Sequence, residues 1–311
     1  MKSLKFISYF FFGIGLVDLF LSFLGVEMWS TYLSVNPPEI FTKFSAFIEL
    51  LIGYSLLYAS KSEEHLKKFL NNLKALMWAL LIAGVIRTFA IEPFKIPSGS
   101  MKPNLLVGDF LFVSKWDYGY SRYSFPFGFP PFKGKIFEKS PSRGDIIVFK
   151  LPGQENINYV KRLVGLPGET IKVIDGLIYI KKEGSDNFEV MEQSEDGLFF
   201  DKQENAQLPQ LIENNYKILN GRVDKVTYAN GEVKEVLNTK TFLDDTPEYK
   251  IPENKFFFMG DNRDNSADSR VMSGVGFVPK ENIIGKVWFI WFSIDSTSFN
   301  IRFDRIFSTV K

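Results

Sequence analysis

Three apolar stretches, each about as long as a membrane-spanning helix, occupy most of the first 91 residues of the chain. They cover roughly residues 6–24, 41–59 and 73–91. A helix needs about 20 apolar residues to cross the hydrocarbon core of a bilayer. We therefore expect residues 1–91 to form a membrane anchor with about three transmembrane helices. The alternative for any one of them is a buried globular helix or, for the first, a cleavable signal peptide, although this stretch lacks a small-x-small cleavage site.

The distribution of lysine predicts the orientation of these helices. Lys2 and Lys5 precede the first stretch, and residues 61–74, between the second and third, carry four lysines. Residues 25–40, between the first and second, contain no lysine or arginine. Positively charged connectors stay on the cytoplasmic side. We therefore expect the tail and the second connector inside, and everything after Ile91 outside.

The remainder of the chain has the pattern of a mainly β domain. Short β-branched and aromatic runs alternate with Gly, Pro, Asn and Asp, and helical periodicity is weak. The dipeptides Asp175-Gly176, Asn220-Gly221 and Asn230-Gly231 lie between such runs and favour tight hairpin turns. The candidate strands are residues 110–113, 146–149, 159–164 and 287–292.

A polar, acidic segment without a clear period, residues 185–210, indicates an insertion in this β domain. We expect a β core made of residues 92–169 and 252–311, and an inserted smaller β-rich subdomain made of residues 170–251. The role of the part of it from 176 to 249 stays open.

Two further stretches are rich in aromatic residues. Residues 118–132 also contain Pro and Gly, which favours an exposed loop at the level of the lipid headgroups. The candidate strand 287–292 carries two tryptophans and two phenylalanines, and we expect these rings to pack into the core.

Composition excludes several kinds of chemistry. The chain has no cysteine, so it has no thiolate nucleophile, no disulfide and no Cys-based zinc site. The net charge of +1 implies no general attraction to nucleic acid. The single histidine, His65, lies in the connector expected inside, across the membrane from everything after Ile91. A serine nucleophile in the β domain would therefore need another base, and a desolvated lysine is the best candidate.

Ser98-Gly99-Ser100 follows directly after the last apolar stretch, and Lys161 is the strongest candidate base for Ser100. If residues 159–164 form a strand, Lys161 shares an apolar face with Tyr159 and Leu163. Burial disfavours the ammonium form, and neutrality near pH 7 requires the pKa to fall by about 3 units from ~10.4. Taken alone, a Ser-Gly-Ser is usually a turn and a strand lysine is usually solvated.

Two more features complete the candidate site. The backbone N–H of Ser100 and the hydroxyl of Ser98 are placed to donate to an oxyanion. The polar segment 260–270 favours an orienting loop, in which Ser266 holds a lysine amine and Asp268 pairs with Arg270. A calcium loop is the alternative, but Gly and Glu are missing from the positions where such loops need them, so we expect no metal.

Four segments, taken in order, resemble the type I signal peptidases (leader peptidases), which are membrane serine proteases with a Ser–Lys dyad. They are EPFKIPSGSMKP at 92–103, SRGDIIVF at 142–149, YVKRLVGLPGE at 159–169 and GDNRDNSADSR at 260–270. Chains of this family often have one or two anchoring helices, whereas we count three stretches here. Threonine is common at the position of Asn104.

The resemblance implies a β-rich catalytic domain with a smaller inserted β subdomain, no cofactor, and cleavage of signal peptides from exported preproteins after small residues at −1 and −3. It implies a bacterial cytoplasmic (inner) membrane, with the catalytic domain on the extracytoplasmic side. Ser100 would be the nucleophile and Lys161 the general base. The orienting and oxyanion residues would be Ser98, Ser266, Asp268 and Arg270, and the apolar subsites would involve Phe94, Ile96, Met101, Leu105 and Val160.

The expected partners are therefore signal peptides of preproteins and the lipid bilayer, without nucleic acid. The principal alternative is a membrane-anchored export component that binds signal peptides without cleaving them. A self-cleaving Ser–Lys protease related to repressors would need a DNA-binding module, whose place is taken here by the apolar stretches.

Overall fold

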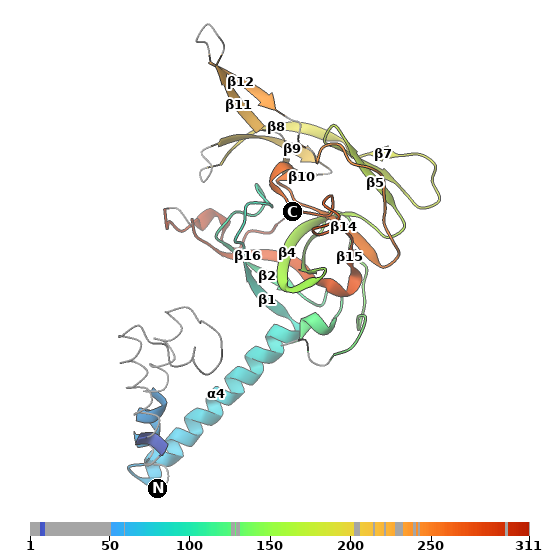
Figure 1. The fold of residues 1–311 in the computed structure, drawn as a ribbon. Helices are drawn as coiled ribbons and strands as arrows, with labels where there is room; N and C mark the ends of the chain where they lie inside the picture. The colour runs from blue at the N-terminus through green and yellow to red at the C-terminus, as the bar shows by residue number, and fades with distance from the viewer. Residues whose placement is uncertain are drawn as a thin grey trace. The chain divides into compact units, whose positions relative to one another are not determined.

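The computed structural model divides the chain into two compact units, Met1–Gly84 and Val85–Lys311. It describes residues 7–9, 51–58, 60–125, 128, 131–201, 206–213, 215–220, 222–227, 233–238, 241, 243–295 and 298–310 (Figure 1).

One long helix, α4 (Glu63–Phe89), carries the third apolar stretch. The Ser62 hydroxyl accepts a hydrogen bond from the backbone N–H of His65, 3.2 Å away, and so caps the first turn. The helix is long and apolar enough to cross a membrane, and its most apolar window has no buried residue. It begins earlier than expected, because the capped, lysine-rich connector 61–74 is itself helical from Glu63 onward. It also ends two residues earlier, since Ile91 already belongs to a strand.

The first apolar stretch, apart from residues 7–9, lies outside the described residues. Of the second stretch, residues 51–58 are described and are helical. The number of membrane-spanning helices therefore stays a prediction.

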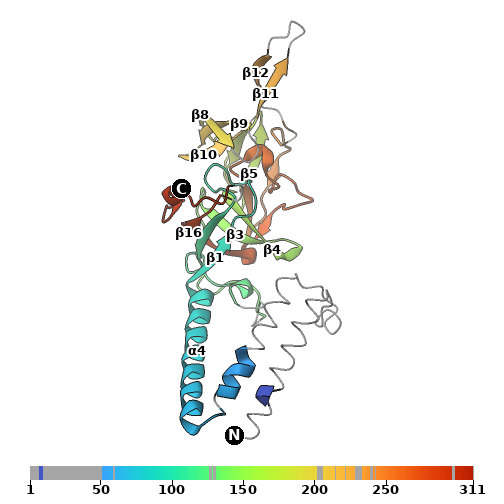
Figure 2. The same ribbon diagram turned by 90° about the vertical axis from the view of Figure 1, so that its left-hand side faces the viewer.

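The expected mainly β domain is confirmed by a seven-stranded antiparallel sheet with the order β1-β2-β16-β3-β4-β14-β15. Figure 2 labels β1, β3, β4 and β16 of this sheet. All four candidate strands are present, each somewhat longer than predicted. The strands are β1 (Ile91–Lys95), β2 (Asp109–Ser114), β3 (Ile146–Leu151), β4 (Gln154–Gly165), β14 (Lys255–Met259), β15 (Val278–Pro279) and β16 (Ile283–Ser293).

Three smaller sheets are formed between β4 and β14 in the sequence. The first has the order β13-β5-β6-β7, with β13 (Tyr249–Lys250), β5 (Thr170–Ile174), β6 (Leu177–Lys181) and β7 (Glu189–Val190). The second has the order β10-β9-β8, with β10 (Tyr216–Leu219), β9 (Ala206–Glu213) and β8 (Gln193–Asp201). The third pairs β11 (Arg222–Thr227) with β12 (Val233–Asn238). Short 3₁₀ helices include η1 (Arg122–Ser124), η3 (Arg263–Asn265), η4 (Lys280–Asn282) and η5 (Phe303–Arg305).

The three predicted hairpin turns have different outcomes. Asp175 and Gly176 both have positive φ, 49° and 76°, and join the paired strands β5 and β6 as expected. Residues 230–231 lie outside the described residues, but the strands that flank them, β11 and β12, are paired. The prediction of a hairpin at Asn220-Gly221 was wrong, because the flanking strands do not pair with each other: β10 pairs with β9 and β11 pairs with β12, in different sheets.

The aromatic side chains of β16 do not all enter the core, contrary to expectation. Val287 and Ile290 are buried, whereas Trp288 is 49% exposed. Two register shifts along β16 interrupt its alternation and leave other rings half-buried on the sheet surface, where Trp291 stacks on Phe112 of β2 at 5.6 Å. The loop after β2 also differs from expectation at its start, because Tyr118 is buried and donates a hydrogen bond to Asp145 at 2.7 Å.

Candidate active site

Ser100 and Lys161 meet although 61 positions separate them in the chain. Ser100 lies in the turn that follows β1, and Lys161 lies on β4. Lys161 Nζ is 2.6 Å from Ser100 Oγ and also donates to the Val160 carbonyl at 3.1 Å. The lysine side chain passes over the Tyr159 ring, with Nζ 5.1 Å from its centroid. The strand alternation that predicted an apolar face for Lys161 therefore agrees with its position in the fold.

The environment of Lys161 favours its neutral form. The residue is only 3% exposed. Burial lowers the pKa of its ammonium from the ordinary value of 10.5 to about 8, although the nearby carboxylates of Asp268 and Asp261 act in the opposite direction. An amine with a pKa near 8 is an effective proton acceptor close to neutral pH.

The segment 260–270 packs directly behind the Ser100 turn. Two hydrogen bonds from Asn262 hold this turn: its backbone N–H donates to the Ser100 carbonyl and its side-chain amide donates to the Gly99 carbonyl, each at 3.1 Å. A side chain at Gly260 would clash with the Ser100 carbonyl oxygen and with the Ser266 hydroxyl. The loop and the turn therefore approach as closely as a glycine allows.

Asp268 and Arg270 form a buried two-bond ion pair within this loop, with Nε–Oδ1 and Nη2–Oδ2 distances of 2.9 Å. Burial alone would raise the pKa of the Asp268 carboxyl, but the Arg270 guanidinium holds it below its usual range. Asp268 also accepts a hydrogen bond from the Gly260 backbone N–H at 3.0 Å. The pair therefore braces the two ends of the loop.

The two other serines are not joined to the dyad. Ser266 is buried near Gly260, but no hydrogen bond links its hydroxyl to Lys161 among the described residues. Ser98 is exposed at the surface, two residues before the nucleophile candidate. Both hydroxyls lie in segments that border the dyad.

A groove of about 830 Å³ contains the dyad. Phe94, Ile96, Met101 and Val160, four of the five residues expected to form subsites, line it. Leu105 does not line it, because its fully buried side chain packs in the hydrophobic cluster behind the groove.

Sequence reasoning did not anticipate the ion pair between Arg162 and Asp261. Arg162 Nε and Nη2 donate to the two carboxylate oxygens, both at 2.7 Å, and both side chains are buried. Since Arg162 follows Lys161 on β4, alternation sends it to the opposite face of the strand, where it holds the start of the 260–270 loop. An arginine next to a lysine expected to be buried indicated a buried carboxylate as its partner, but the sequence did not identify Asp261 as that carboxylate.

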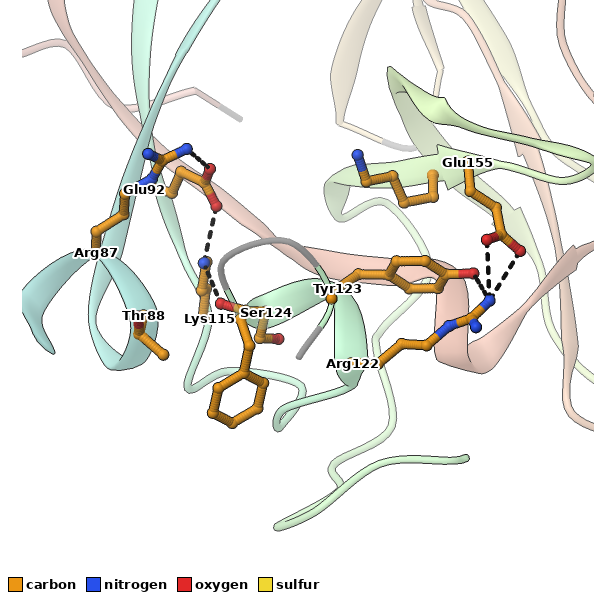
Figure 3. A pocket seen from close by; sticks show the side chains of 11 residues that line it. Arg87, Thr88, Glu92, Lys115, Arg122, Tyr123, Ser124 and Glu155 are labelled. Atoms are coloured by element: carbon orange, nitrogen blue, oxygen red, sulfur yellow. Dashed lines mark hydrogen bonds and ion pairs between the residues drawn. The ribbon is translucent and has the colours of Figure 1, made fainter. Parts of the chain in front are cut away.

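A second cavity, of about 510 Å³, adjoins the last turn of α4 (Figure 3). In it, Glu92 binds two cations, Lys115 at 2.8 Å and Arg87 at 3.0 Å, and Lys115 Nζ also donates to the Ser124 carbonyl at 2.8 Å. Burial lowers the pKa of Lys115, opposed by Glu92. This network ties the end of α4 to β1 and to the segment after β2.

Within the described part of the chain, no group of three or more His, Cys, Asp or Glu side chains is arranged to hold a metal ion.

Comparison with known proteins gives one consistent family. The family model described as "Signal peptidase, peptidase S26" matches residues 69–292. A signal peptidase I of Rickettsia akari is 43% identical over 219 residues, which are 70% of this chain and 77% of that protein. One of Rickettsia typhi is 42% identical over 223 residues, 71% of this chain and 79% of that protein. The crystal structure of a signal peptidase I from Enterococcus faecalis covers 48% of this chain and 97% of its own, with 27% identity and a TM-score of 0.26.

Proposed function

Because the chain belongs to the signal peptidase family, peptidase S26, we propose that it removes signal peptides from exported preproteins with Ser100 as nucleophile and Lys161 as general base. Membership confirms the resemblance carried by the four sequence segments. The observation that supports the dyad is the 2.6 Å contact between Ser100 Oγ and the amine of a buried lysine.

In the proposed reaction, neutral Lys161 accepts the proton of the Ser100 hydroxyl while Oγ attacks the carbonyl carbon of the scissile bond. The ammonium then donates this proton to the nitrogen of the leaving mature protein. A water molecule hydrolyses the resulting ester, with Lys161 again as the base. The same amine thus serves both half-reactions, first against the Ser100 hydroxyl and then against water, and returns a proton to Ser100 Oγ as the ester is cleaved; no imidazole is needed.

The other residues are given supporting roles. The backbone N–H of Ser100 and the exposed, rotatable hydroxyl of Ser98 stabilise the developing oxyanion. Ser266, buried behind the dyad, is assigned to orient the Lys161 amine. Asp268 and Arg270 keep the loop that carries Ser266 in place.

The groove supports recognition of small side chains. We assign its apolar walls to contacts with the side chains at −1 and −3 of the preprotein; these walls are Phe94, Ile96, Met101 and Val160. Leu105 acts indirectly by packing behind these walls. Shallow apolar subsites favour small residues because a larger side chain cannot be accommodated without displacing the core.

The architecture is proposed to match this task. Residues 92–169 and 252–311 form the catalytic core, and 170–251 form an inserted subdomain. Signal peptidases are bacterial membrane-associated enzymes, and α4 is the candidate anchor helix. The lysine distribution supports a catalytic core on the extracytoplasmic side of the inner membrane, where signal peptides emerge.

The test is cleavage of a preprotein with alanine at −1 and −3 by the full chain in detergent. Ser100→Ala and Lys161→Ala are each expected to lower kcat/KM by roughly 10³-fold or more, because nucleophile and base act as one unit. The matched control is Lys182→Ala, which removes an exposed lysine far from the groove and is expected to cleave normally.

Near-normal cleavage by Lys161→Ala would show that Lys161 is not the general base. If the wild-type chain binds the preprotein but leaves it intact, the chain is instead a signal-peptide-binding export component.

A further inference from the structure

Strands β8, β9 and β10 contact two segments of the site, the Ser100 turn and the 260–270 loop behind it. Two buried ion pairs cross from these strands to the site. Glu213, at the end of β9, accepts hydrogen bonds from Nη1 and Nη2 of Arg263, and Asp201, at the end of β8, binds Lys102 Nζ. None of the four side chains is more than 4% exposed.

Glu213 holds the loop that contacts Ser100. The Arg263 side chain that it binds donates from Nε to the Gly260 carbonyl at 3.2 Å. Between these two residues, Asn262 donates to the carbonyls of Ser100 and Gly99. The position of the Ser100 backbone therefore depends on the Glu213 carboxylate, through Arg263 and the 260–270 loop.

Glu213 is itself fixed before it reaches Arg263. It accepts hydrogen bonds from the Gln193 amide at 2.7 Å and from the Tyr216 hydroxyl at 3.0 Å. Burial alone would raise the pKa of its carboxyl, but Arg263 holds it below the usual range. Tyr216 also covers Arg162, whose guanidinium carbon lies 3.9 Å from the ring centroid. The same strands thus support the residue next to Lys161.

Asp201 acts on the other side of the nucleophile. The side chain of Lys102 folds back over Gly99 on its way to Asp201, so closely that a Cβ at position 99 would lie 2.8 Å from Lys102 Cε. The backbone N–H of Lys102 donates to the Gly99 carbonyl at 3.1 Å. The ion pair with Asp201 therefore fixes the side chain that covers the Ser100 turn.

Backbone contacts run alongside these ion pairs. The Leu219 N–H of β10 donates to the Asp261 carbonyl at 2.8 Å, and the Asn104 side chain donates to the Lys217 carbonyl at 2.6 Å. Catalytic geometry tolerates errors of only about 0.5 Å. Contacts that set the distance between the Ser100 turn and the 260–270 loop therefore bear on the rate.

We propose that Glu213 and Asp201 are positioning residues, through which strands β8–β10 hold Ser100 and its supporting loop in the geometry that Lys161 requires. This rests on the proposed function of the Ser100–Lys161 dyad. It gives the segment 170–251 a role in the reaction without any contact with substrate.

The experiment compares Glu213→Gln and Asp201→Asn with the wild-type full chain in detergent, using a preprotein with alanine at −1 and −3. We expect kcat to fall about 10- to 100-fold, since a displacement near 1 Å costs on the order of 10²-fold. KM should change less than about threefold, because neither Glu213 nor Asp201 lines the groove, and Phe94 and Val160 of its walls lie on β1 and β4. The matched control is Glu189→Gln, which removes an exposed ion pair of the same segment and should leave both constants unchanged.

A second readout does not depend on cleavage. The pH dependence of acetylation at Lys161, read by peptide mass spectrometry, reports the surroundings of its amine. We expect the midpoint to shift in Glu213→Gln and to stay in place in Glu189→Gln. The double variant Glu213→Gln/Arg263→Gln should be no worse than Glu213→Gln alone if the carboxylate acts through this arginine.

Rates are expressed per folded molecule, with near-ultraviolet circular dichroism as the measure. If Glu213→Gln does not fold, Glu213→Asp, which keeps the charge but shortens its reach, replaces it. Wild-type kcat and an unchanged acetylation profile in the folded variants would overturn the positioning role. Failure of the wild-type chain to cleave would instead overturn the dyad, and the acetylation shift would still be measurable.

Discussion

At the scale of the residue, the proposed mechanism gives one lysine the role that histidine has in more familiar serine proteases. Lys161 is buried, with its amine over the Tyr159 ring and against the Ser100 hydroxyl, and burial is the main cause of its low pKa. The carboxylates of Asp261 and Asp268 limit this effect. Both carboxylates raise the pKa of the amine, which therefore stays more basic than burial alone would leave it.

The pH profile of the enzyme should follow Lys161. Its amine must be neutral to act as a base, so kcat/KM is expected to rise with pH through a midpoint of about 8. Stability should move in the same direction, because between about 8 and the ordinary value of 10.5 the unfolded chain binds the additional proton. Initial rates of preprotein cleavage from pH 6 to 10 test the first expectation. A flat profile across this range would contradict it.

Much of this residue-level picture follows from sequence, and part of it does not. The burial of Lys161 was predictable because a strand alternates its faces, and the motif resemblance paired it with Ser100. The contacts of Asn262 with Ser100 and Gly99 were not, because they depend on how a distant loop packs. The same holds for Glu213 and Asp201, which are ordinary acidic residues in a segment without a recognisable motif.

At the scale of the element, β4 serves two faces of the molecule. One residue of the strand, Lys161, points to the nucleophile, and the next, Arg162, points away from it to Asp261 at the start of the 260–270 loop. The strand was predictable from its apolar run. The aromatic packing of β16 was not, because register shifts displaced rings that strict alternation would have buried.

The buried pair of β4 should matter for stability. Asp261→Ala leaves the Arg162 guanidinium buried without its carboxylate, which we expect to cost about 3–5 kcal/mol of the free energy of unfolding. Glu189→Ala breaks an ion pair at the surface and should have a much smaller effect. Urea unfolding of the full chain in detergent, followed by tryptophan fluorescence, measures both. Equal midpoints for the two variants would show that burial of the pair contributes nothing.

At the scale of the whole molecule, the candidate membrane helix α4 precedes a mainly β domain. The sequence predicted both parts, and lysine counts predicted which side of the membrane each end occupies. The beginning of α4 was placed too late, because a lysine-rich segment can be a connector or the polar first turns of a helix. Only the cap at Ser62 distinguishes the two.

The absence of native cysteine makes this orientation measurable. A single cysteine introduced by Lys67→Cys, at an exposed position near the start of α4, should resist an impermeant maleimide in intact bacterial cells. Ser185→Cys, exposed in the β domain, should be labelled. Both should react after detergent is added. Labelling of the Lys67→Cys chain in intact cells would reverse the proposed orientation.

The junction between α4 and β1 is short and hydrogen-bonded on both sides. Only Ala90 separates the end of the helix from the start of the strand. Its N–H donates to the Ile86 carbonyl of the helix at 2.8 Å, and its carbonyl accepts from Lys115 at 3.1 Å. Both contacts lie within the unit Val85–Lys311 and join the last turn of the helix to the sheet. A residue inserted beside Ala90 would therefore break one of these two hydrogen bonds, so the length of the junction is set by its bonding as well as by its sequence.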